Sequence, residues 1–223
     1  MRIREPGKIK DNLWYLGCEE SGVYLLEGHD ESMLISGGMS YLVPMLLRQF
    51  KEFSRDQERI TKILILHAHF DHVGIIPFFK RSHPDITVYA SARAWELLST
   101  PEVIETINTF SRSVSETMGM LEACSAYDLN WRDDISGITV SEGQRIDLGD
   151  MKAHILETPG HSSCSISAYV PKLKTLFPSD GGAFPIKTPS SLLETLITPS
   201  FSRALRGSRA WKWTTCAPTT VGT

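Results

Sequence analysis

A cluster of metal-binding side chains directly after an apolar segment constrains this chain more than any other feature. Ile63–Leu66 is continuously apolar, which is typical of a strand buried on both faces. The segment is followed within six residues by His67, His69, Asp71 and His72. Because alternate side chains of an extended segment point the same way, His67 and His69 can converge on one ion. Asp71 and His72, about one turn further on, can then face a neighbouring ion.

Two later segments offer further ligands. His161 follows Pro159-Gly160 at the end of an expected strand, and it supplies the third nitrogen that a catalytic zinc needs beside an open position for water. Asp180 follows the expected strand Thr175–Phe177 and precedes two glycines, whose backbone freedom allows a close approach to a metal. We interpret Asp180 as a carboxylate that bridges two ions. Imidazole and carboxylate ligands favour zinc, with manganese and iron as alternatives.

The HxHxDH pattern, the Pro-Gly-His corner and the later aspartate together resemble the metallo-β-lactamase superfamily. That superfamily includes glyoxalase II, lactonases, thioesterases and RNA-processing nucleases, and the resemblance runs from about Leu13 to Phe184. It implies an α/β fold, a four-layer αββα sandwich with the site at one edge of the two sheets. It also implies one metal on His67, His69 and His161, a second on Asp71 and His72, and Asp180 between them.

Two positions qualify the resemblance. Position 69 is histidine, whereas the oxygen-reducing diiron branch carries glutamate there, so hydrolysis is favoured over redox chemistry. Ser36-Gly37-Gly38 stands where many members have Asp-Thr-Gly, and this departure is expected to loosen the site around its ligands.

The expected mechanism follows from the one or two metal ions. A bound cation lowers the pKa of its water from about 15.7 towards 7, which creates hydroxide at neutral pH. The hydroxide attacks a carbonyl whose developing negative charge the metal stabilises. Asp71 is the expected catalytic residue, since its carboxylate can orient the nucleophile and carry the proton. We therefore expect a metallo-hydrolase that cleaves an ester, thioester or lactone in a small molecule.

The pattern of strands and helices predicts a single domain over residues 1–223. Short strand-like runs alternate with helical spacing, and no linker divides the chain. Residues 91–134 show helical spacing without strand-like alternation, so we expect a helical insertion there. Its methionine and aromatic residues favour an apolar substrate pocket.

Charge and targeting signals narrow the alternatives. An RNA-processing nuclease of the same superfamily is one, but a net charge of −3 gives no basic face for nucleic acid. No apolar run reaches the roughly 20 residues that span a bilayer. The N-terminus lacks an apolar signal region and the four cysteines are scattered, so we expect a cytoplasmic protein. The oligomeric state stays open, with a dimer among the alternatives.

The C-terminal stretch, residues 201–223, is atypical. The superfamily normally places one more histidine ligand near the end of the domain, but no histidine follows His161. A shifted reading frame from about Phe201 would permit an Asp-His pair, which makes a frameshift one hypothesis. The other hypothesis is a metal-binding protein with weak catalysis because its last ligand is missing.

Overall fold

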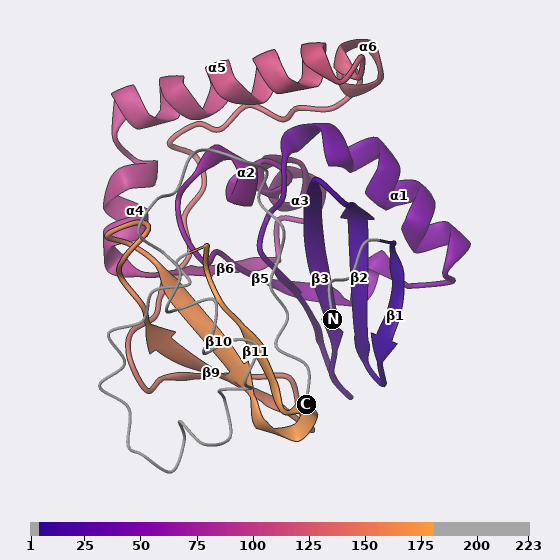
Figure 1. The fold of residues 1–223 in the computed structure, drawn as a ribbon, viewed down its shortest axis with the longest axis vertical. Coiled ribbons are helices and arrows are strands. Elements are labelled where there is room, and N and C mark those ends of the chain that lie inside the picture. The colour runs from indigo at the N-terminus through magenta and orange to yellow at the C-terminus, as the bar shows by residue number, and fades with distance from the viewer. Residues whose placement is uncertain (1–4, 181–223) are drawn as a thin grey trace, which may run out of the picture.

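The computed structural model describes residues 5–180, whose strands form two sheets (Figure 1). The larger sheet contains, in spatial order, β1 (Gly7–Lys10), β2 (Leu13–Cys18), β3 (Ser21–Glu27), β4 (Ser32–Ile35), β5 (Ile60–Leu64), β6 (Thr87–Ala90) and β7 (Ile138–Thr139). The smaller sheet contains β11 (Thr175–Phe177), β10 (Ile166–Val170), β9 (Lys152–Glu157) and β8 (Arg145–Asp147). Strands β1 to β4 and the whole smaller sheet are antiparallel, whereas β4 to β7 pair in parallel.

The parallel pairs require crossover connections, and helices supply them. The helices are α1 (Val43–Glu52) between β4 and β5, then α2 (Phe70–Val73) and α3 (Ile76–Ser82) between β5 and β6, and finally α4 (Ala92–Leu98), α5 (Pro101–Thr117) and α6 (Leu121–Cys124) between β6 and β7. Short 3-10 turns occur at Ser40–Leu42, Gln57–Arg59 and Pro171–Leu173. Figure 1 shows α5 lying across α2 at one end of the molecule.

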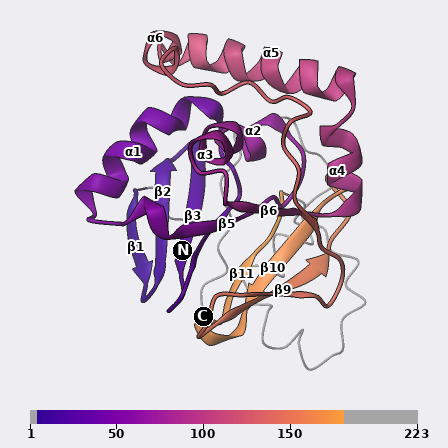
Figure 2. The same cartoon turned by 180° about the vertical axis from the view of Figure 1, so that it is seen from behind.

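Side-chain alternation in the larger sheet divides the interior into two cores. In β4, Leu34 packs with the helices, while Met33 and Ile35 point to the opposite face and pack against the smaller sheet. Ile63 and Leu64 of β5 divide in the same way. This period of two explains why the strand is apolar on both faces. In the view from behind, α1 and α3 lie on one side of the larger sheet, and β9 to β11 lie on the other (Figure 2).

The order of helices, larger sheet and smaller sheet confirms the expected α/β fold. Residues 5–180 contain three of the four layers, and a helical layer outside the smaller sheet is not among them. The tail at 201–223 also lies outside the described residues. The helices expected within residues 91–134 are α4, α5 and α6. Within the described part of the chain, no helix has the length and apolar character needed to cross a membrane.

Candidate metal centre

The side chains of the centre start from the carboxyl ends of parallel strands. His67 follows β5 by three residues, and Ser36 comes directly after the neighbouring strand β4. Parallel strands end at the same edge of a sheet, so these two residues meet there, as ligand-binding residues often do in sheets of this kind. The smaller sheet contributes to the same edge, because the N–H of Ile166 donates to the carbonyl of Leu66, just before His67.

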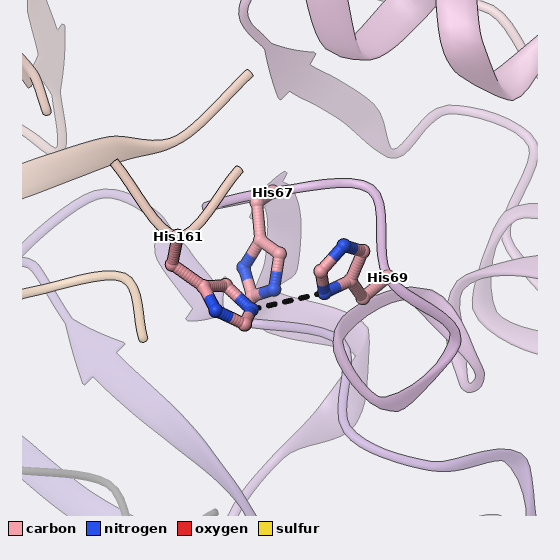
Figure 3. A group of neighbouring side chains, drawn as sticks. All are labelled: His67, His69 and His161. Atoms are coloured by element: carbon pink, nitrogen blue, oxygen red, sulfur yellow. Dashed lines mark hydrogen bonds between the residues drawn. The ribbon is translucent and has the colours of Figure 1, made fainter. Parts of the chain in front are cut away.

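His67, His69 and His161 converge from two distant segments (Figure 3). One ring nitrogen from each lies within 4.8 Å of the others. The Nε2 of His161 and the Nδ1 of His69 are 3.1 Å apart. Nitrogens bound tetrahedrally to one zinc at 2.0–2.1 Å would be roughly 3.3 Å apart, so this spacing suits a shared cation. We call these three residues the three-histidine group.

A second set of side chains lies beside the first. His67, His72 and Asp180 also offer ligand atoms within 4.8 Å of one another. The Asp180 carboxylate lies 3.1 Å from Nε2 of His72, 4.0 Å from Nε2 of His67 and 3.9 Å from Nε2 of His161. Asp180 therefore contacts His72 most closely and also faces two members of the three-histidine group. Asp71 belongs to neither set, but its carboxylate is 3.6 Å from Nε2 of His72.

The burial of His67 provides a test of whether these residues suit a metal. Its side chain is fully buried, and its Nε2 has no hydrogen-bond partner among the described residues. A buried polar atom without a partner is costly, so this nitrogen needs an occupant that the protein itself does not supply. A cation held by three imidazoles satisfies the atom and matches the usual ligand set of catalytic zinc. The residues present therefore fit a metal.

The pKa shifts of His67 and His69 keep these two imidazoles in the neutral form that binds metal. Burial, together with the charge of His72, lowers the pKa of His67 well below its usual value, although Asp180 opposes the shift. Burial and then His161 lower the pKa of His69. Neutral imidazoles have the free lone pair that a metal requires. Burial alone would lower the pKa of His72, but its hydrogen bond to Asp180 and the charge of that carboxylate raise it.

The loop after β4 fixes the position of His72. The Ser36 hydroxyl lies 2.8 Å from Nδ1 of His72, on the ring edge opposite to Asp180. The N–H of Gly37 donates to the carbonyl of His72, and the N–H of Gly74 donates to that of Gly38. A Cβ on Gly37 would come within 2.5 Å of the His72 carbonyl oxygen, so glycine is required for this approach.

Cys164 connects the two ligand-bearing loops. It is buried in the core, and its Sγ accepts a hydrogen bond from the N–H of Ala68, between His67 and His69. The Ser91 hydroxyl, after β6, donates to the Cys164 carbonyl. The loop that carries His161 is thereby attached to the ends of both β5 and β6.

The structure brings five of the six expected ligands into the two sets, and places Asp71 against His72. Sequence reasoning noted Ser36 only as a departure from the usual Asp-Thr-Gly, and it missed Ser179, whose hydroxyl lies 2.9 Å from Nδ1 of His67. Serine is common on all surfaces, and only the position of Ser179 directly before Asp180 could have drawn attention to it.

Comparison with known proteins identifies relatives of this chain. The family model described as the metallo-beta-lactamase superfamily matches residues 16–214. The acyl-coenzyme A thioesterase MBLAC2 of Homo sapiens is 24% identical over 177 residues, which cover 75% of this chain and 60% of that protein. A hydroxyacylglutathione hydrolase of Legionella pneumophila (strain Paris) is 25% identical over 125 residues, covering 56% of this chain and 35% of that protein. The chain thus spans less than two thirds of either relative.

Solved structures share the fold. A motif mutant of the metallo-beta-lactamase from Cronobacter sakazakii has a TM-score of 0.61 at 24% identity, covering 92% of this chain and 74% of that one. An archaeal metallo-beta-lactamase superfamily protein from Sulfolobus tokodaii has a TM-score of 0.56 at 19% identity, covering 80% and 66%. At these identities the likeness concerns the fold alone.

Proposed function

This chain belongs to the metallo-beta-lactamase superfamily, and we propose that it is a hydrolase that cleaves a thioester, ester or lactone by metal-assisted attack of water. The observation that carries the proposal is the three-histidine group, whose nitrogens lie within 4.8 Å of one another. Within residues 5–180, the buried Nε2 of His67 has no hydrogen-bond partner. A thioester is the first substrate to test, because one relative is named as a thioesterase.

The metal contributes the chemistry that the side chains lack. When bound, a cation such as zinc lowers the pKa of a coordinated water towards 7 and polarises the carbonyl of the substrate. His67, His69 and His161 would hold it, and three protein ligands leave a position for water. Manganese and iron remain alternatives to zinc.

In this proposal Asp180 positions His72, and Asp71 transfers protons. Asp180 holds His72 through a 3.1 Å contact and faces the three-histidine group at 3.9–4.0 Å. The Asp71 carboxylate lies 3.6 Å from the same ring nitrogen of His72. An acceptor carboxylate in this place can take a proton from the attacking water and return it to the leaving group. We assign that role to Asp71.

The helices after β6 supply an apolar surface next to these ligands. Phe70, between His69 and Asp71 in the chain, stacks on Phe110 of α5 with ring centroids 5.4 Å apart. Phe110 remains 51% exposed, so part of its ring is available to a substrate. An apolar wall with a few polar groups is usual in small-molecule sites, and we propose that this stack contacts an acyl chain.

The proposal can be tested with zinc-loaded protein and a substrate panel. The panel contains acyl thioesters of short and long chain, an aryl ester, an acyl-homoserine lactone, a β-lactam and a structured RNA. We expect turnover of the thioesters, with a preference for the longer acyl chain. Phe110→Ala should reduce this preference while leaving turnover of the shortest substrate nearly unchanged.

The matched control is Phe78→Ala, which removes an aromatic ring that contacts Phe79 and Tyr127 rather than Phe70. Zinc-dependent cleavage of RNA without cleavage of any ester, thioester or lactone would contradict the proposal. Equal loss of long-chain preference in both variants would contradict the role of Phe110.

A further inference from the structure

His67 is connected to a short chain of buried hydroxyl groups. Its Nδ1 lies 2.9 Å from the Ser179 hydroxyl oxygen. The Ser179 hydroxyl donates in turn to the Ser165 hydroxyl oxygen at 3.2 Å. All three side chains are at least 95% buried, with exposed fractions of 0% for His67, 5% for Ser179 and 2% for Ser165. The Nε2 of the same ring faces Asp180 and has no hydrogen-bond partner among the described residues.

The number of protons available on the Ser179 and Ser165 hydroxyls determines which ring nitrogen of His67 carries hydrogen. A serine hydroxyl has one proton to donate and two lone pairs that accept. Because Ser179 donates its proton to Ser165, it can act only as an acceptor towards His67. The hydrogen bond therefore requires a proton on Nδ1 of His67. In a neutral imidazole the other nitrogen, Nε2, then has a free lone pair.

The other ligand histidines lack this arrangement. His69 and His161 contact each other through ring nitrogens, and the His161 side chain is about one third exposed. Ser36 contacts Nδ1 of His72, but within residues 5–180 its hydroxyl has no second side-chain partner, so it can donate or accept. Among the described ligand histidines, only His67 has its tautomer set by a hydroxyl that is already committed as a donor.

We propose that Ser165 and Ser179 are positioning residues that hold His67 with its proton on Nδ1, so that Nε2 faces the centre ready to bind a cation. The inference deepens the proposed function and rests on it for the identity of the centre, but the tautomer itself does not depend on catalysis. A histidine fixed in this way needs neither ring rotation nor proton exchange when metal arrives. Loss of such an outer partner typically costs 10–100-fold in metal affinity.

The test compares four variants in the metal-free and zinc-titrated protein. Ser165→Ala releases the Ser179 proton, which can then be donated to Nδ1 of His67 and shift the ring proton to Nε2. Ser179→Ala removes the partner altogether, and Ser165→Thr keeps a hydroxyl. The matched control is Ser167→Ala. Ser167 is equally buried, on β10, but its hydroxyl pairs with Thr158 at 2.9 Å rather than with Ser179 or Ser165.

Two readouts are needed, and the first requires no metal. Nitrogen-15 NMR of the histidine rings at neutral pH distinguishes the two tautomers, and zinc affinity is measured by competition with a chelator. We expect a single Nδ1–H tautomer for His67 in the wild type, in Ser165→Thr and in Ser167→Ala. We expect a mixture of tautomers in Ser165→Ala. Zinc affinity should fall about 10–100-fold in Ser165→Ala and Ser179→Ala but remain near wild type in the other two.

The outcomes separate this inference from the proposed function. Wild-type protein with the His67 proton on Nε2, or a Ser165→Ala protein whose His67 tautomer is unchanged, would overturn the inference even if the enzyme were active. Equal losses of zinc affinity in Ser165→Ala and Ser167→Ala would do the same, since that result indicates a general packing effect. Wild-type protein that holds Nδ1–H but neither binds zinc nor hydrolyses any substrate would contradict the proposed function while supporting the tautomer assignment.

Discussion

The two sets of ligands differ in how completely the described residues build them. The three-histidine group offers three imidazole nitrogens, which is the full protein share of a catalytic zinc site. The second set, His67, His72 and Asp180, shares His67 with the first. The lone pair of one imidazole nitrogen binds one ion, so His67 cannot serve both. Once His67 is committed to the first ion, the residues within 5–180 leave the second ion with His72 and Asp180, and with Asp71 nearby.

The two sets also differ in the hydrogen bonds that hold their histidines. His67 is fully buried, and its Nδ1 contacts a serine that donates onward to a second serine. His72 is held by a single serine hydroxyl and by Asp180. The difference teaches that the two positions should be unequal, with one ion bound more tightly than the other.

The largest effect is expected from His67→Ala, because it removes a fully buried imidazole from the three-histidine group that holds the tighter ion. Loss of a ligand should exceed the 10–100-fold loss of affinity that follows removal of an outer partner, so bound zinc should fall to near zero after dialysis. Metal analysis measures the result. His154→Ala is the matched control, since His154 lies on β9 and belongs to neither set. Unchanged zinc content in His67→Ala would show that the metal lies elsewhere.

Asp71→Asn should separate catalysis from metal binding. Asp71 lies near His72 but outside both sets, so the three-histidine group should keep its ion. A group that transfers protons in the transition state contributes typically 10²–10⁴-fold, and we expect turnover to fall by about that factor. Steady-state kinetics with matched zinc content measures it. Near-normal turnover would exclude the proton-transfer role, and loss of the tight ion would make Asp71 a ligand of the first set.

The smallest effect is expected from Ser36→Ala, which acts on His72 alone. Loss of the 2.8 Å contact to Nδ1 should weaken the second ion by about tenfold and leave the first unchanged. A zinc titration that resolves two binding steps measures both affinities. Ser32→Ala is a suitable control, because Ser32 is a buried serine at the start of the same strand, β4. An equal change in both binding steps would contradict the prediction that Ser36 affects the second ion alone.

Much of the centre could be predicted because its chemistry is written in short patterns. His67, His69 and His72 stand next to one another in the chain, and their convergence follows from strand geometry. The apolar run before them predicted the buried strand, although β5 ends at Leu64. Beyond it, the N–H of Ile65 donates to the carbonyl of Tyr89, and the carbonyl of Leu66 accepts from Ile166. Residues this close in sequence remain close together in the folded protein, so their grouping can be predicted.

Features that depend on long-range packing could not be predicted. β1 and β8 carry charged residues and lack a clear apolar alternation, so their strand structure comes from pairing with β2 and β9. The contact of Ser179 with His67 joins residues 112 positions apart, and a serine has no spacing rule that reveals such a partner. The stack of Phe70 on Phe110 depends likewise on how α5 lies across α2.

The most direct test of the account is a zinc titration of the metal-free chain by calorimetry, alongside His161→Ala and His72→Ala. We predict one tight ion and a second bound at least about tenfold more weakly, the lower end of the range for outer-partner effects. His161→Ala should abolish the tight step, because it removes one of three imidazoles, whereas His72→Ala should abolish only the weak step. Two ions of equal affinity in the wild type, or a tight step that survives His161→Ala, would contradict the account.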